Sequence, residues 1–342
     1  MKTYLVTGGA GFIGSAYVRY VYKNDPEAHI IVLDALTYAG NLDNIPHEIQ
    51  QSERFEFWYG NVNNLDLVSE LVSRSRFVVH FAAETHVARS LYSNRDFFET
   101  DVLGTQSVAN AVLRWTDNVE RFVHISTSEV YGSAEYEPMD EKHPLLPTSP
   151  YAAAKAGADR LVHSYYVTYD IPSVILRPFN NYGPQQHLEK VIPRFITSAL
   201  LDEPLTVHGS GEAARDWLYV EDTVRMVDLL VHAPEDKVKG EVFNAGTNSC
   251  VSVLDIAQII LDILGKPKTL IHHMEDRIGQ VVKHIGSRSK AFERLGFEPQ
   301  VSFEEGLQKT IEWYKNHPKW WEKMLTLRKV PVKLRTGKVV YY

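Results

Sequence analysis

The chain has 342 residues, a formal net charge of −7 and one cysteine, Cys250. This modest negative charge provides no basic footprint for nucleic acid or for an anionic membrane surface, so neither is expected as a partner. A single cysteine excludes an intramolecular disulfide and fits a reducing compartment. With no apolar run of about 18 residues and no signal-peptide pattern, the sequence predicts a cytoplasmic protein.

The first half of the chain alternates short apolar runs with helical patterns. The predicted strands are residues 4–7, 30–33, 55–59, 77–81, 122–126 and 173–177. The predicted helices are residues 12–22, 65–73, 96–115 and 151–169. Repeated βα units indicate an α/β protein with a Rossmann-type, doubly wound parallel sheet that helices cover on both faces.

After residue 178 the pattern loosens, with helices predicted at residues 191–201, 251–264 and 303–315. We therefore expect a first domain over residues 1–178 and a smaller α/β substrate domain over residues 179–342. Some segments of the second half are expected to return to the sheet of the first.

Gly8, Gly11 and Gly14 follow the first predicted strand and open the first predicted helix. Glycine at these positions allows a tight turn and lets the backbone approach a diphosphate, which the N–H groups of the helix N-terminus attract. Asp34 ends the second strand, where a carboxylate accepts hydrogen bonds from ribose hydroxyls and repels a 2′-phosphate. The pattern predicts NAD, in preference to NADP, as the cofactor.

A second group of residues favours redox chemistry on a hydroxyl. Thr127, Ser128 and Glu129 follow the fifth predicted strand, and the carboxyl ends of parallel strands are where ligands bind. Tyr151 and Lys155 share one helix face, so the lysine cation is expected to lower the pKa of the phenol. The hydroxyl of Thr127 can stabilise charge on the reacting oxygen.

No metal site is expected from the sequence. His272 and His273 are adjacent, and in a strand their side chains would point to opposite faces.

These motifs resemble the extended short-chain dehydrogenase/reductases, and within them the dTDP-glucose 4,6-dehydratases. The segments that carry the closer resemblance are residues 32–42, 84–87, 149–152, 180–184, 189–193 and 215–222. The resemblance implies that Tyr151 takes the proton of the sugar C4 hydroxyl while a hydride passes from C4 to NAD. Glu129 would then remove the C5 proton, water would leave from C6, and the hydride would return to C6.

The same resemblance implies further binding residues and an assembly. The cofactor set adds Phe12, Ile13, Thr37, Asn61, Val62, Ala82 and Ala83. The nucleotide-diphosphate sugar would meet His86, Asn180, Lys190, Val191, Arg215, Asn244 and Arg277. A homodimer would pair the helices at residues 96–115 and 151–169 across a two-fold axis.

The chain departs from the dehydratase pattern at Ser128, where that family usually has an aspartic acid that protonates the departing C6 hydroxyl. GDP-mannose 4,6-dehydratases and UDP-glucuronate decarboxylases also read Thr-Ser-Glu here. A decarboxylase and a C4 epimerase therefore stay open as alternatives to the dehydratase. A catalytically silent binding protein on the same fold is a further alternative, which the intact Thr127, Glu129, Tyr151 and Lys155 disfavour.

Overall fold

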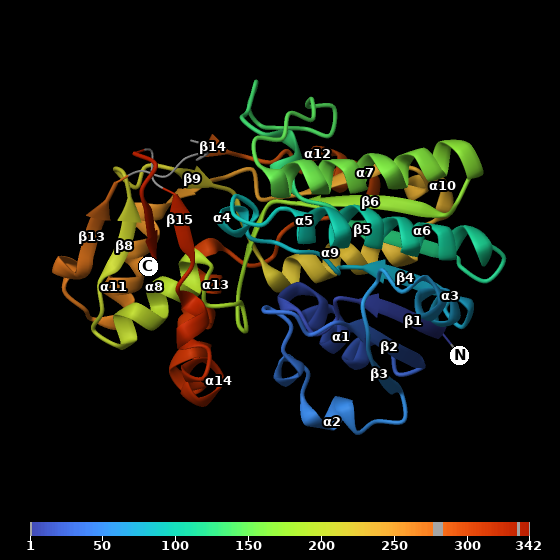
Figure 1. The fold of residues 1–342 in the computed structure, drawn as a ribbon, viewed down its shortest axis with the longest axis horizontal. Helices are drawn as coiled ribbons and strands as arrows, with labels where there is room; N and C mark the ends of the chain where they lie inside the picture. Colours follow the sequence, from blue (N-terminus) through green and yellow to red (C-terminus); the bar gives the residue numbers. More distant parts are fainter. Residues whose placement is uncertain (1, 276–282, 334–335, 342) are drawn as a thin grey trace.

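A seven-stranded parallel sheet organises the first half of the chain in the computed structural model, which describes residues 2–275, 283–333 and 336–341 (Figure 1). The strand order is β11-β6-β5-β4-β1-β2-β3. The strands are β1 (Lys2–Thr7), β2 (Ala28–Asp34), β3 (Phe55–Tyr59), β4 (Phe77–His80), β5 (Arg121–Ile125), β6 (Ser173–Pro178) and β11 (Val242–Ala245).

Alternating side chains of these strands enter two different cores, because successive residues of a strand point to opposite faces. Tyr4 and Val6 of β1 are buried beneath α1 (Phe12–Asn24) and α9 (Val220–His232). Leu5 lies on the other face, which is covered by α3 (Leu65–Ser73), α6 (Thr105–Arg114) and α7 (Pro150–Tyr169). The predicted Rossmann-type fold is confirmed.

The second half builds a separate core beside the carboxyl ends of the strands. Three small sheets surround it, joining β7 (Asn180–Tyr182) to β10 (Trp217–Tyr219), β8 (Leu205–His208) to β13 (Ile271–Met274), and β9 (Ala214–Arg215) to β12 (Val251–Ser252) and β14 (Lys283–His284). Its main helices are α8 (Val191–Leu200), α11 (Val253–Leu264) and α13 (Phe303–Asn316). Their apolar faces meet in one cluster.

Short elements complete the chain. They are η1 (Leu42–Asn44), α2 (His47–Gln50), α4 (Val87–Ser90), α5 (Arg95–Phe97), η2 (Phe98–Gly104), η3 (Ser128–Tyr131), α10 (Glu235–Val238), η4 (Lys268–Leu270), α12 (Ser289–Leu295), α14 (Pro318–Glu322), η5 (Leu325–Arg328), β15 (Pro331–Lys333) and β16 (Val339–Tyr341). Among the described residues, no helix has the length and apolar character that crossing a bilayer requires.

Two elements of the second half belong to the large sheet. Strand β11 pairs with β6 at the sheet edge, and α9 packs beside α1 on one face. The sequence pattern suggests such a return but does not identify these two segments. Their partners lie far away in the chain, so local periodicity carries no information about the pairing.

The helix predicted over residues 96–115 is present, because residues 95–114 are helical without a break, but its middle is not a regular α-helix. The segment divides into α5, the π-helical η2 and α6. The hydroxyl of Thr105 donates to the backbone oxygen of Asp101 at 2.6 Å, and such a side-chain bond competes with the regular helical ladder. Local widening of this kind is typical of functional sites.

A buried ion pair fastens α7 to the sheet. Arg177 on β6 donates from Nε and Nη2 to the two carboxylate oxygens of Asp159, both at 2.8 Å, and both side chains are almost fully buried. The third nitrogen of Arg177 donates to the hydroxyl of Tyr131 at 3.1 Å. Burial alone would raise the pKa of Asp159, but the hydrogen bonds and charge of Arg177 hold it below its ordinary value.

We predict that Arg177→Met lowers the free energy of unfolding by about 3–5 kcal/mol, because Asp159 would then be a buried charge without its partner. Arg160 also contacts Asp159, at 2.5 Å, but its side chain is 43% exposed. The control Arg160→Met should therefore cost less than about 1 kcal/mol. Chemical denaturation measures both; equal losses would contradict the role given to Arg177.

Candidate active site

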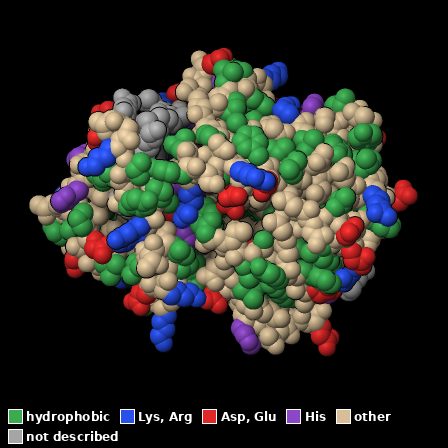
Figure 2. Space-filling model, viewed as in Figure 1, with side chains coloured by type: hydrophobic (Ala, Val, Ile, Leu, Met, Phe, Trp, Pro, Cys, Tyr) green, Lys and Arg blue, Asp and Glu red, His purple; other side chains and the backbone are tan. Residues whose placement is uncertain are grey.

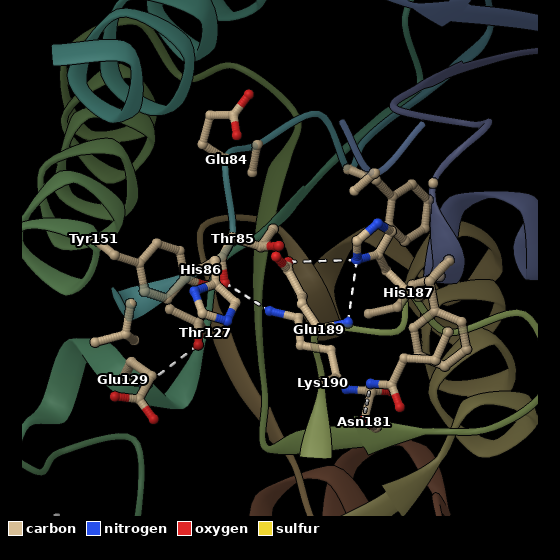
Figure 3. A pocket seen from close by; sticks show the side chains of 18 of the residues that line it. Glu84, Thr85, His86, Thr127, Glu129, Tyr151, Asn181, His187, Glu189 and Lys190 are labelled. Carbon is tan, nitrogen blue, oxygen red and sulfur yellow. Dashed lines mark hydrogen bonds and ion pairs between the residues drawn. The ribbon is translucent and has the colours of Figure 1, made fainter. Parts of the chain in front are cut away.

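A long cavity runs along the carboxyl ends of the sheet strands and continues between the two halves of the chain. At one end lie the glycine-rich turn and Asp34, and at the other α8 and Arg215. In Figure 3, Tyr151, Thr127 and Glu129 occupy one side, and His187, Glu189 and Lys190 lie across from them. On the face of the molecule in Figure 2, acidic and basic side chains are interspersed.

The glycine-rich turn has the geometry of a diphosphate cradle. Gly8 has a φ of +69°, and a Cβ there would lie 2.6 Å from the backbone nitrogen of Ala82. A Cβ at Gly14 would lie 2.2 Å from the carbonyl oxygen of Gly8, so both glycines are required by the fold. Gly11 is different, because a Cβ there would meet only that oxygen, at 3.2 Å, and would otherwise project into the cavity.

The first turn of α1 points its N-terminus at the same part of the cavity. Gly11 provides no side-chain cap, and Phe12 and Ile13 line the cavity wall. Uncapped N–H groups and the positive end of the helix dipole suit a diphosphate.

Asp34 lies at the end of β2 and contacts the glycine-rich turn. Its carboxylate accepts the N–H of Ala10 at 2.9 Å and the N–H of Leu36 at 2.8 Å. Burial raises its pKa, although these backbone hydrogen bonds oppose the shift. The remaining predicted cofactor residues also line the cavity: Thr37, Asn61, Val62, Ala82 and Ala83.

Thr127 and Glu129 enter the cavity from the turn after β5. The Thr127 side chain caps η3 and accepts the N–H of Glu129 at 3.2 Å. Glu129 lines the cavity, next to Thr127 and below Tyr151 in the view of Figure 3. Ser128 is only 2% exposed, although it contributes to the wall.

Tyr151 stands in the first turn of α7, where its local sequence places it. Ser149 caps the helix by accepting the N–H of Ala152 at 3.1 Å, and Pro150 occupies the first helical position. One turn later, Lys155 is buried and donates from Nζ to the backbone oxygen of Ile125 at 2.7 Å.

The pKa shift expected for Tyr151 is wrong in direction. Burial raises the pKa of Tyr151 above its ordinary value and the charge of Asp101 adds to this, while a hydrogen bond with Thr127 opposes it. The Lys155 ammonium is directed to Ile125, and burial lowers its own pKa. Desolvation therefore sets the direction of the pKa shift of Tyr151, which the helical spacing of Lys155 alone does not predict.

The carboxyl groups of Asp101 and Glu84, to which the sequence alone assigned no role, lie near Tyr151 and Lys155. Asp101, on the π-helical η2, is fully buried; one of its oxygens accepts the N–H of Glu84 at 2.7 Å. Burial raises the pKa of Asp101 to about 7, against the opposing charge of Lys155. Burial likewise raises the pKa of Glu84, which lines the cavity, to about 7, against a hydrogen bond with Thr37. Only the resemblance of residues 84–87 pointed toward this region.

The substrate end of the cavity has five of the predicted residues in its wall: His86, Asn180, Lys190, Val191 and Arg215. Lys190 Nζ donates to the backbone oxygen of Thr85 at 2.9 Å, which ties the second half of the chain to the first. His86 caps α4 by accepting the N–H of Arg89 at 3.3 Å.

Glu189 is a third carboxyl group to which the sequence alone assigned no role. Its side chain is fully buried and accepts from Arg89 Nε at 2.9 Å. Burial alone would raise the pKa of Glu189, but His86, Lys190 and His187, with the hydrogen bond from Arg89, hold it below its ordinary value. This ion pair is a second link between the two halves across the cavity.

The assignment of Asn244 to the substrate is corrected. Asn244 is fully buried and does not line the cavity. Its side chain accepts from the hydroxyl of Tyr131 at 2.7 Å and donates to the backbone oxygen of Met139 at 3.1 Å. Both ends of the amide are therefore used to hold the segment after η3. Arg277, also predicted to bind substrate, lies outside the described residues.

These features fit a bound dinucleotide, because the glycine-rich turn leaves space where a side chain would project and Asp34 faces the same cavity. Within the part of the chain that the structure describes, no three metal-ligating side chains cluster together. A Rossmann-type sheet with a Tyr-x-x-x-Lys helix beside this cleft defines a short-chain dehydrogenase/reductase of the extended type.

Comparisons with known proteins show which family of extended short-chain dehydrogenase/reductases this chain resembles. The sequence model of the family described as GDP-mannose 4,6 dehydratase matches residues 5–310. The low-salt glycan biosynthesis protein Agl12 of Haloferax volcanii is 42% identical over 91% of this chain and 97% of its own length. A dTDP-glucose 4,6-dehydratase of Actinoplanes sp. is 40% identical over 93% of this chain and 99% of its own.

Solved structures agree with these relatives. DesIV, a dTDP-glucose 4,6-dehydratase of Streptomyces venezuelae crystallised with NAD, gives a TM-score of 0.89 at 39% identity, covering 94% of this chain and 99% of that one. A UDP-glucose 4-epimerase of Thermotoga maritima gives 0.84 at 30% identity, covering 92% and 99%. This chain belongs to the GDP-mannose 4,6-dehydratase family of nucleotide-sugar enzymes.

We predict that Asp34→Asn weakens NAD binding roughly tenfold, because a charged acceptor of the ribose hydroxyls becomes neutral. Calorimetric titration with NAD measures the effect. Asp66→Asn, at an exposed carboxyl in the first turn of α3, is the matched control and should bind as the wild type does. Unchanged affinity in Asp34→Asn would refute this placement of the adenosine ribose.

Proposed function

We propose that this protein is an NAD-dependent nucleotide-sugar 4,6-dehydratase that converts a substrate such as dTDP-glucose into its 4-keto-6-deoxy product. The observation that carries the proposal is the grouping of Tyr151, Thr127 and Glu129 around one part of the cavity, between the glycine-rich turn and Arg215. The relatives named as dTDP-glucose 4,6-dehydratases support the choice of reaction.

The first step requires removal of the proton from the sugar C4 hydroxyl. Tyr151 is assigned as the base, and the Thr127 hydroxyl stabilises charge on the same oxygen. NAD, held by the glycine-rich turn and Asp34, would supply the hydride acceptor for C4 and the hydride donor for C6, and its positive charge would favour the phenolate form of Tyr151. Lys155, one helical turn after Tyr151, lines the same cavity and is held by its hydrogen bond to the backbone oxygen of Ile125.

The second step uses Glu129. A ketone at C4 acidifies the C5 proton, which the Glu129 carboxylate removes. The hydroxyl at C6 then departs with a proton as water, and Glu129 is the one carboxyl of the Thr-Ser-Glu turn able to supply it. Ser128 is a poor acid and is almost completely buried, so one glutamate serves as base and then as acid.

Arg215 and Lys190 are assigned to the substrate diphosphate. Arg215 is mostly buried in the cavity wall, and Lys190 follows the turn before α8. A guanidinium fork and an ammonium suit adjacent phosphate groups.

The alternative reactions predict different mass changes of the sugar nucleotide. A decarboxylase would release carbon dioxide, and an epimerase would leave the mass unchanged.

Tyr151→Phe is expected to lower kcat roughly 10²- to 10⁴-fold, the usual contribution of a general base. Glu129→Gln is expected to oxidise C4 but not eliminate water, so reduced cofactor accumulates while no product of lower mass forms. Mass spectrometry after incubation with dTDP-glucose, UDP-glucose and GDP-mannose, together with cofactor absorbance, distinguishes the two variants.

Tyr169→Phe, at an exposed tyrosine at the end of the same helix, is the control and should leave kcat unchanged. Full turnover by either Tyr151→Phe or Glu129→Gln would eliminate the corresponding role. A wild-type protein that changes the mass of none of the three sugars would eliminate the proposed reaction.

We also propose a homodimer through the outer surface of η2, α6 and α7. Leu103 on η2 is 51% exposed and Val167 on α7 is 68% exposed, and Phe98 is 43% exposed nearby in the chain. Apolar side chains exposed on neighbouring helices suit burial against a second copy.

The double variant Leu103→Asp and Val167→Asp should then sediment as a monomer, because the charges would be buried in the interface. Leu65→Asp, at an exposed residue of α3, is the control and should sediment as the wild type does. A wild-type monomer in analytical ultracentrifugation would end this proposal.

A further inference from the structure

The segment from Pro318 to Lys333, here called the C-terminal strap, lies beyond the residues that the family's sequence model matches, which end at 310. The strap comprises α14, η5 and β15. In Figure 1, α14 lies at the bottom of the molecule and β15 lies higher, towards α4, so the strap runs along the second half of the chain.

The beginning of the strap is anchored to the cofactor end of the cavity. Trp320 Nε1 donates to the side-chain oxygen of Asn44 at 3.2 Å, and Lys323 forms an ion pair with Asp43. Asn44 in turn donates to the backbone oxygen of Ala10 at 2.9 Å, within the glycine-rich turn. The Asn44 side chain therefore connects the strap directly to the glycine-rich turn.

The middle of the strap is anchored to the substrate end. Arg328, whose side chain is 12% exposed, forms an ion pair with Glu203 and donates to Ser198 Oγ on α8 at 3.2 Å. Helix α8 begins directly after Lys190, so this anchor holds the element that carries the proposed diphosphate ligand.

The end of the strap forms part of the cavity wall. Val330 is 2% exposed and lines the cavity that holds Tyr151 and Arg215. Strand β15, which follows it, pairs with β16 and packs against α4, directly after His86. Ala88 and Leu91, in and just after α4, line the same cavity. The wall thus includes apolar side chains from two segments far apart in the sequence.

We propose that the C-terminal strap closes the substrate end of the cleft and that Val330 is a specificity-determining residue for the nucleotide sugar. This inference rests on the proposed function for the identity of the ligand. An apolar wall offers no hydrogen bond to a polar group placed against it, so it favours a ligand that presents carbon there. The anchors at Asn44 and Ser198 couple this wall to both ends of the cavity.

The first experiment measures binding of dTDP-glucose and UDP-glucose to the NAD-loaded protein in the Tyr151→Phe background, where turnover is stopped. Val330→Thr keeps the shape of the side chain but adds a hydroxyl, and it should weaken binding roughly tenfold. Val339→Thr, at an exposed valine of β16, is the matched control and should change nothing. Thermal unfolding must be equal in the two variants, and equal binding by both would overturn the role of Val330.

The second experiment needs no sugar, so it separates failure of the strap from failure of the proposed function. Hydrogen exchange of the amides of α14 and η5 is followed with and without NAD. Slower exchange with NAD is expected, because Asn44 joins the strap to the glycine-rich turn. Unchanged exchange would overturn the coupling. If the protein binds dTDP-glucose but does not dehydrate it, the proposed reaction is wrong. The binding and exchange measurements would still test the role of the strap and of Val330.

Discussion

The position of every reacting group depends on one buried interaction, the double hydrogen bond between Arg177 and Asp159. It fixes α7 against β6, and α7 carries Tyr151 and Lys155 into the cavity. The same guanidinium reaches Tyr131, whose hydroxyl donates to Asn244 on β11, so the turn that presents Glu129 is held by the same network. Removing two charges from water is costly, but the complete set of hydrogen bonds makes the geometry unique.

Around the cleft, the pKa of each buried carboxyl depends on the balance between desolvation and neighbouring cations. Glu84 and Asp101 have pKa values raised to about 7, while the pKa of the buried Glu189 is held below its ordinary value by its cationic neighbours. The outcome differs because the charges of His86, Lys190 and His187, together with the hydrogen bond from Arg89, stabilise the Glu189 carboxylate. The same balance explains the raised pKa of Tyr151. Its phenol is buried, and the Lys155 ammonium donates to the backbone oxygen of Ile125.

The two halves of the chain meet across this cleft through direct links. Lys190 donates to Thr85, and Arg89 pairs with Glu189. The C-terminal strap adds links from Asn44 and Ser198, so cofactor and sugar sites are joined by contacts and not only by the covalent chain. In a reaction that removes a hydride and returns it to the same sugar, such closure would keep the intermediate in place.

The sequence by itself determined six of the seven strands of the sheet, the glycine-rich turn, Asp34 and the spacing of Tyr151 and Lys155. These features are local, since alternation, caps and turns act over a few residues. Tertiary structure alone decided that β11 and α9 join the sheet, that Asn244 supports η3, that Asp101 lies beside Lys155, and that Val330 forms the cavity wall. Each of these features depends on residues that are distant in the chain. Local sequence patterns do not show which distant residues will come into contact, nor how strongly that contact buries a side chain.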